Sequence, residues 1–258
     1  LWFLDQLEPG SVAYNIPGAV RLKGRLDVEA LQHTLNEVVR RHEALRTTFV
    51  AVNGEPVQVI SPASQVELPV MDLSELPEEE REAAVHQWAG AEAQRPFDLS
   101  VGPLLRVQVL RLGAEEHVVL FTLHHIISDG WSTGILVREV AALYEAYIEG
   151  RESSLPELEI QYADYAVWQR EWLQGEVLEQ QLAYWRQQLE ELPVLQLPTD
   201  KPRPPVQSHR GRSLNFSVPA ALTAELKKLS NGERVTLYMT LLAAFKILLW
   251  RYSGQSDV

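Results

Sequence analysis

The chain has 258 residues, 46% hydrophobic and 22% charged, and its formal net charge of −12 argues against a nucleic-acid partner, which requires a basic surface. It contains no cysteine, which excludes disulfides, thiolate metal sites and a cysteine nucleophile. No apolar run reaches the ~20 residues of a membrane span, so we expect no membrane partner. The absence of cysteine permits a reducing compartment, and we expect a cytoplasmic location. The chain starts at Leu1 without an initiator methionine, and we expect it to be a piece of a longer protein.

The first hundred residues alternate helix and strand patterns. Asp27 precedes apolar residues at helical spacing and is a suitable N-cap for a helix. The dipeptide Asn53-Gly54 predicts a tight hairpin turn, and Pro77 followed by three glutamates predicts a helix start. The expected elements are a helix over 1–7, a strand over 19–22, a helix from Asp27 to about 43, strands over 45–52 and 57–60, and a helix from Pro77 to about Gln94.

Residues 104–112 and 117–123 predict two strands joined as a hairpin. The second is almost continuously apolar, which indicates a strand buried on both faces. A helical pattern follows over 135–147.

The last hundred residues contain a clear break. Helical patterns over 163–173 and 177–189 are rich in tryptophan and tyrosine, and four prolines then fall within residues 198–205. Such a segment is a stiff extended connector. Beyond it we expect a strand over 214–218, a helix from Pro219, and an apolar helix over 237–250. The pattern predicts an α/β (α+β two-layer) lobe over 1–197, a connector over 198–205, and the start of a second lobe over 206–258.

A polar cluster, His124, His125, Asp129 and Gly130, follows the buried strand directly. Polar groups at the end of a core strand are costly unless they are paired or used. Because side chains alternate along a strand, only one of the two histidines can face a cleft, and the other is expected to be buried. A cleft-facing imidazole can take a proton or position an amine or hydroxyl. The alternative interpretation is two core histidines and a turn-forming Asp-Gly.

Two arginines are candidate supports for this cluster. A buried carboxylate at Asp129 needs a cationic partner, and Arg46 or Arg41 is an attractive one. Such a pair would hold the loop after His125 in place. Gly130 allows close backbone approach to a ligand, and its N–H is suited to face a developing oxyanion.

Competing motifs are weaker. Residues 130–134 (Gly-Trp-Ser-Thr-Gly) match the nucleophile elbow of a serine hydrolase, with Ser132 as nucleophile, but the only downstream histidine is His209. His42-Glu43 begins like a zinc-protease helix, but Arg46 stands where the second histidine ligand must be. His124 or His125 with Asp129 lacks a third metal ligand. We therefore expect no metal.

Four segments together resemble the condensation domains of non-ribosomal peptide synthetases. Residues 124–130 match the family's His-His-x-x-x-Asp-Gly motif without departure. Residues 1–7, 41–47 and 162–169 resemble the end of the first core motif, the second motif and the fourth. The sequence over 9–17 is similar to the subtype that joins an L-configured donor to an L-configured acceptor.

The resemblance implies a chloramphenicol-acetyltransferase-like N-terminal lobe, and two such lobes with a tunnel between them in the complete domain. It implies peptide-bond formation between substrates on the 4'-phosphopantetheine arms of upstream and downstream carrier domains, beside a neighbouring adenylation domain, with no cofactor bound directly. By motif position, His125 is the active-site histidine and His124 its neighbour. Asp129 is mainly structural, and Gly130 lies close to the reacting carbonyl. Trp131 and Ser132 are tunnel candidates.

Departures from the family pattern limit what the resemblance implies. Cyclisation relatives carry Asp in place of His124, and non-catalytic recruiting relatives tend to lose the motif, which is intact here. The family's members are roughly twice this length, so we expect the first lobe nearly whole, only the start of the second, and no activity in this piece alone. A carrier-docking or recruiting module without chemistry remains the alternative, with the Ser132 hydrolase behind it.

Overall fold

The computed structural model describes residues 1–205 and 214–258. These residues divide into two compact units, Leu1–Trp172 and Leu173–Val258. The proline-rich residues 198–205 lie inside the second unit by this division. The lobe boundary expected at the prolines stays a prediction.

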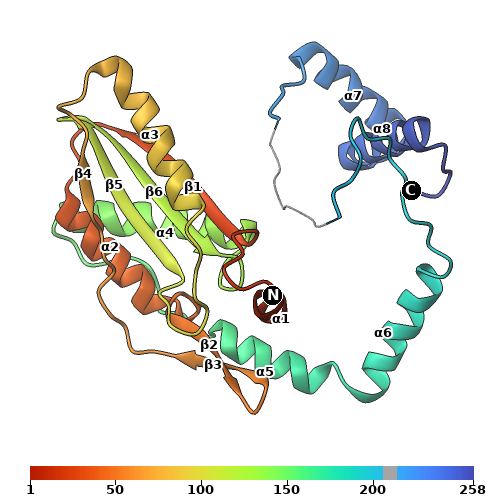
Figure 1. The fold of residues 1–258 in the computed structure, drawn as a ribbon, viewed down its shortest axis with the longest axis horizontal. Coiled ribbons are helices and arrows are strands. Elements are labelled where there is room, and N and C mark those ends of the chain that lie inside the picture. Colours follow the sequence, from red (N-terminus) through yellow and green to blue (C-terminus); the bar gives the residue numbers. More distant parts are fainter. Residues whose placement is uncertain (206–213) are drawn as a thin grey trace. The chain divides into compact units, whose positions relative to one another are not determined.

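A four-stranded sheet forms the centre of the first unit, in the order β1-β6-β5-β4 (Figure 1). Strand β6 (Glu116–His124) pairs antiparallel with β1 (Asn15–Lys23) and with β5 (Leu105–Gly113), and β4 (Val70–Asp72) pairs parallel with β5. The two central strands confirm the predicted hairpin. Pro17 is tolerated in β1 because β1 is an edge strand, where a missing N–H breaks no inner ladder. Strand β4 has no sequence signal, since three residues are too few to show alternation.

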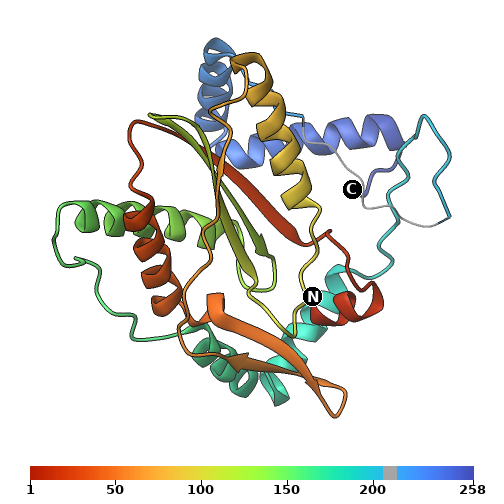
Figure 2. The same ribbon diagram turned by 60° about the vertical axis from the view of Figure 1, so that its left-hand side comes forward.

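Helices cover both faces of this sheet, as Figures 1 and 2 show. Helices α2 (Val28–Arg41) and α4 (Gly130–Ile148) pack against each other on one face, and α3 (Glu78–Ala93) packs on the other. The α/β class is therefore confirmed, with helices on two sides of the sheet. The reason is that β5 and β6 present buried side chains to both faces: Val85 of α3 meets Leu110, Leu112, Val118 and Leu120, while the opposite face packs against α2 and α4.

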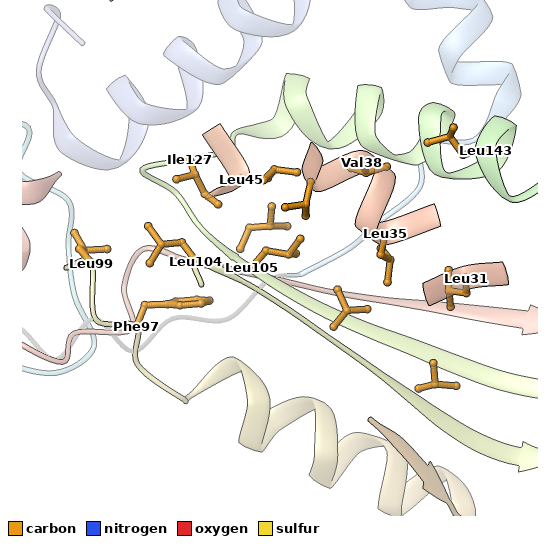
Figure 3. Packing of buried hydrophobic residues seen from close by; sticks show 14 residues of the cluster. Leu31, Leu35, Val38, Leu45, Phe97, Leu99, Leu104, Leu105, Ile127 and Leu143 are labelled. Atoms are coloured by element: carbon orange, nitrogen blue, oxygen red, sulfur yellow. The ribbon is translucent and has the colours of Figure 1, made fainter. Parts of the chain in front are cut away.

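The larger core lies between the sheet and α2 and α4. Figure 3 shows its buried side chains in this space. Burying each such side chain contributes about 1.5–3 kcal/mol, and the helical spacing of the α2 residues places them all on the inner face. The labelled core residues are Leu31, Leu35, Val38, Leu45, Phe97, Leu99, Leu104, Leu105, Ile127 and Leu143.

Local sequence signals account for several boundaries. The side chain of Asp27 caps α2 by accepting from the N–H of Ala30 at 2.9 Å. Strands β2 (Thr47–Val52) and β3 (Glu55–Ile60) form the predicted hairpin as a separate sheet. Its turn residues Asn53 and Gly54 both have positive φ, at 53° and 84°, as a type I′ turn requires. A 3₁₀ turn, η1 (Glu43–Arg46), precedes β2, so the strand predicted from residue 45 begins later.

The remaining helices follow their sequence patterns with small shifts. Helix α1 (Trp2–Leu7) and helix α5 (Tyr162–Trp172) belong to the first unit, and α6 (Gly175–Gln188), α7 (Ala220–Gly232) and α8 (Leu237–Ser253) belong to the second. The strand expected over 214–218 is wrong: these residues form no regular element, because no described segment pairs with them. Within the described ranges no single helix has the length and apolar composition to cross a membrane, and the pair α7 and α8 reaches it together only across a 104° bend.

Candidate active site

The polar cluster forms the turn between β6 and α4. Strand β6 ends at His124, and α4 begins at Gly130. The backbone N–H of His124 donates to the carbonyl of Leu104 at 3.0 Å, and that of His125 donates to the carbonyl of Tyr14 at 2.8 Å. The turn is thus fixed at its start by residues next to the neighbouring strands β5 and β1.

His124 is a buried, neutral histidine. The centroid of its ring lies 6.3 Å from that of Tyr14 and 6.0 Å from that of Phe97, and the residue is 3% exposed. Its Nδ1 accepts a hydrogen bond from the N–H of Ile126 at 3.1 Å, so Nδ1 is unprotonated and the proton lies on Nε2. Burial, and next the charge of His125, lowers the pKa of His124 to about 4. His124 therefore shapes the turn in its uncharged form.

His125 is exposed, and it lines a cavity of about 550 Å³. The alternation argument expects this difference between the two histidines, one buried and one facing a cleft. The cavity is lined by the end of α2 and η1, the β2–β3 hairpin, the start of α4 and the start of α5. Its wall includes His42, Leu45, Phe49, Ile127, Ser128, Asp129, Ser132, Ile135, Leu136 and Tyr162.

Asp129 caps α4. Its Oδ1 accepts from the N–H of Ser132 at 2.8 Å and from the hydroxyl of Ser132 at 2.7 Å. These hydrogen bonds, the hydroxyl's first, hold the pKa of the Asp129 carboxyl below its usual range. The helix predicted from residue 135 therefore begins five residues earlier, because a capping side chain satisfies its first turn.

The expected ion pair between Asp129 and Arg41 or Arg46 is wrong: Asp129 makes no ion pair with any residue that the structure describes. Arg41 is buried and lies 3.3 Å from Glu139, and it donates to the carbonyl of Pro156 at 2.8 Å. Glu139 lies ten residues beyond Asp129, about 15 Å along α4, and it is this part of α4 that faces the end of α2.

Arg46 also has other partners. Its guanidinium donates to the carbonyl of Ser61 and to the carboxylate of Glu43, and it lines a separate cavity of about 560 Å³. Among the described residues, Arg46 therefore makes no hydrogen bond or ion pair with Asp129, the contact through which it was expected to support the site. Arg41 reaches the site indirectly, through the residue it pairs with.

Glu139 and Gln161 are the residues near the site that sequence reasoning missed. Oε2 of Glu139 contacts both Arg41 and Nε2 of His42, the latter at 2.8 Å, and His42 is a wall residue of the cavity. Gln161 donates to the carbonyl of Arg41 at 2.8 Å and accepts from the N–H of Glu43 at 3.1 Å. The sequence could indicate only that a buried arginine needs a carboxylate partner. It could not indicate which carboxylate that is.

The three residues after Asp129 differ in position. Apart from its two chain neighbours and the backbone of its own helix, Gly130 has no described atom within 4 Å of where a Cβ would stand, so the space beside it is open. Trp131 is 84% exposed and is not among the residues that line the cavity, whereas Ser132 does line it. The hydroxyl of Ser132 donates to Asp129, and no histidine in the described part of the chain bonds to it; His209 lies outside the described residues.

Metal ligands do not gather at this site. In residues 1–205 and 214–258 there is no group of three or more histidine, aspartate or glutamate side chains that could hold an ion. The expectation of a site without metal stays an expectation.

Comparisons with known proteins give one consistent answer. The family model "Condensation domain" matches residues 1–258. The chain is 56% identical over 259 residues to a linear gramicidin synthase of Brevibacillus parabrevis, covering 100% of this chain and 5% of that protein.

Two solved structures are similar over nearly the whole chain. One is the complex of the X-domain and OxyB from teicoplanin biosynthesis, with 31% identity, a TM-score of 0.83, and coverage of 98% of this chain and 55% of that chain. The other is the starter condensation domain of rhizomide synthetase, with 23% identity, a TM-score of 0.76, and coverage of 100% and 57%; at this identity it shows the fold alone. The predicted acetyltransferase-like α/β class of the first lobe is confirmed.

Proposed function

Because the chain belongs to the condensation-domain family, we propose that it is part of an acyltransferase that forms peptide bonds in non-ribosomal peptide synthesis. The observation that carries the proposal is the position of His125, exposed on the wall of a cavity and held beside a buried, neutral His124. The chain spans about 5% of the gramicidin synthase and about half of each solved neighbour, so the activity belongs to a larger assembly.

In the proposed reaction, an acceptor amine attacks the carbonyl carbon of a donor thioester. The C–N bond forms, the C–S bond breaks, the thiolate leaves, and the amine loses a proton. His125 serves this step as the base that takes the proton or as the group that orients the amine. The open space beside Gly130 at the start of α4 supports close approach of the reacting carbonyl to the backbone.

The remaining parts of the proposal concern substrates and partners. Donor and acceptor arrive on the phosphopantetheine arms of upstream and downstream carrier domains, with an adenylation domain in the same synthetase. The sequence of residues 9–17 supports the subtype that joins an L-donor to an L-acceptor. Comparing L- and D-configured donors on the upstream carrier tests that subtype directly, and equal use of both would contradict it.

The test of the main proposal is product formation by the synthetase that carries this chain. His125→Ala should lose peptide-bond formation, measured as transfer from donor carrier to acceptor carrier in a single turnover. His86→Ala is a matched control, because His86 is an exposed histidine on α3, outside the cavity. Normal transfer by His125→Ala would sink the assignment.

A second candidate is a recruiting module without chemistry. It is favoured by one observation, the solved X-domain in complex with OxyB, at 31% identity to this chain. Binding of a partner protein by the wild-type synthetase, without transfer between loaded carriers, would support this candidate. The structure weakens the serine-hydrolase interpretation, because the Ser132 hydroxyl donates to Asp129. Failure of a fluorophosphonate to label Ser132 would refute this interpretation.

A further inference from the structure

The cavity beside His125 has mainly apolar walls. Its volume of about 550 Å³ lies within the range of roughly 300–1,000 Å³ that small-molecule sites occupy. Leu45 comes from η1, Phe49 from β2, and Ile135 and Leu136 from the first turns of α4. Three structural elements, with the turn that carries His125, therefore present hydrocarbon to one space large enough for an amino-acid side chain.

Three of the polar groups on this wall direct their hydrogen bonds into the protein, and Gln58 and Tyr162 also line it. Nε2 of His42 contacts Glu139 at 2.8 Å, the hydroxyl of Thr47 donates to the carbonyl of Glu43 at 2.7 Å, and the hydroxyl of Ser132 donates to Asp129 at 2.7 Å. Because these groups are already paired, they offer little to a polar ligand. The hydrocarbon of Leu45, Phe49 and Leu136 therefore makes up much of the surface that an entering group contacts.

Charge adds a second restriction. Asp129 lies on the wall, and its lowered pKa keeps the carboxyl ionised at neutral pH. No lysine or arginine is among the residues that line this cavity in the described chain. An acidic ligand would be repelled and also left without a counter-ion.

We propose that this cavity is a side-chain pocket that selects an apolar aminoacyl group, and disfavours an acidic one, for the condensation step. The inference rests on the proposed function and adds the substrate class. It does not depend on whether His125 acts as base or as orienting group.

Leucine, asparagine and aspartate have side chains with the same number of heavy atoms and the same branching at Cγ, so they vary polarity on one branched shape. Each is loaded on the acceptor carrier of the synthetase with a fixed donor, and then on the donor carrier with a fixed acceptor. In one of the two series, kcat/KM for leucine should exceed that for asparagine about tenfold or more, because the amide gives up hydrogen bonds to water against a mainly apolar wall. Aspartate should be used less than asparagine.

Wall variants assign the preference to this cavity. Leu136→Ala should enlarge the pocket and raise the ratio of phenylalanine to alanine use about tenfold, and Leu136→Phe should lower it. Val137→Ala is the matched control, since Val137 is the next residue of α4, is 56% exposed and does not line the cavity. The ratio of phenylalanine to alanine use is measured within one variant. A lower fraction of folded protein therefore reduces both rates equally and does not change the ratio.

The outcomes are separable. Equal use of leucine, asparagine and aspartate in both series, with normal product formation, would overturn the pocket and leave the proposed function standing. The pocket is overturned as well if Leu136→Ala and Val137→Ala have the same effect on the ratio. No product from any substrate pair in the wild-type synthetase would overturn the proposed function itself.

Discussion

Asp129 and Ser132 form a closed capping pair at the start of α4, in which one carboxylate oxygen accepts from both the N–H and the hydroxyl of the serine. This pair takes the place of the arginine that the sequence suggested as the partner of Asp129. It also occupies the hydroxyl that a serine hydrolase would use. The turn that carries His125 is therefore held at its end by a local helix cap.

Removing this cap should weaken the fold and the site together. We expect Asp129→Ala to lower both the urea midpoint of unfolding and the transfer activity, and Asp129→Asn to retain most of each, because asparagine caps helices nearly as well as aspartate. Asp27→Ala removes the equivalent cap of α2, away from the cavity. It should cost about 1 kcal/mol of unfolding free energy, the usual cost of a lost N-cap, without lowering transfer activity. A larger activity loss from Asp27→Ala than from Asp129→Ala would contradict this.

The neutral, buried His124 predicts a pH dependence of stability. Its pKa is about 4 in the folded protein against 6.5 for an ordinary histidine. Between these values the unfolded chain binds a proton that the folded chain does not, so stability should fall as pH drops from about 6.5 to about 4, by up to about 3 kcal/mol. Above pH 6.5 His124 is neutral in both states and contributes no slope.

The measurement is urea unfolding at several pH values in this window, in wild type and in His124→Asn, which retains an acceptor for the N–H of Ile126 and cannot titrate. Burial also lowers the pKa of His117, so the readout is the difference between the two proteins. Identical slopes would refute the assignment of a low pKa to His124.

The Arg41–Glu139 pair should be costly to break. The side chains are 2% and 12% exposed, and removing one partner leaves a buried charge, so Glu139→Ala should cost about 3–5 kcal/mol. Glu82→Ala breaks an exposed pair with Arg21 and should cost about 0–1 kcal/mol. The double variant Arg41→Met, Glu139→Met should recover much of the unfolding free energy that Glu139→Ala loses. If Glu139→Ala and Glu82→Ala lower the free energy of unfolding in urea by the same amount, the buried pair contributes no more to stability than the exposed pair, and the prediction is wrong.

Gly18 and Phe121 are paired across β1 and β6, and the tip of the phenylalanine ring lies 2.1 Å from where a Cβ at residue 18 would stand. Gly18→Ala must displace this ring, and we expect a loss of about 1–3 kcal/mol. Gly90→Ala, in α3 with nothing within 4 Å, should instead stabilise by roughly 0.5–1 kcal/mol. Thermal unfolding separates the two signs; a stabilising Gly18→Ala would show that the ring moves without cost.

The short-range features of this protein follow from the sequence. The helix starts at Asp27 and Pro77, the Asn53-Gly54 turn and the long apolar strand before His124 each depend on a few neighbouring residues, and the structure has them where they are expected. Strand alternation also indicates that one histidine of the pair is buried and the other faces a cleft. These features depend on local backbone preferences, which the sequence states directly.

Long-range pairing was decided only by the tertiary structure. Residue types indicate that a buried Arg41 needs a carboxylate, but the sequence cannot decide whether Asp129 or Glu139 supplies it. Packing of α2 against α4 selects Glu139, because that part of α4 lies opposite the end of α2. The same packing leaves Asp129 exposed, where it caps its own helix. The packing also brings together residues that line the cavity beside His125. Spacing along the chain cannot specify which faces meet, since helix packing is set by the side chains of both partners at once.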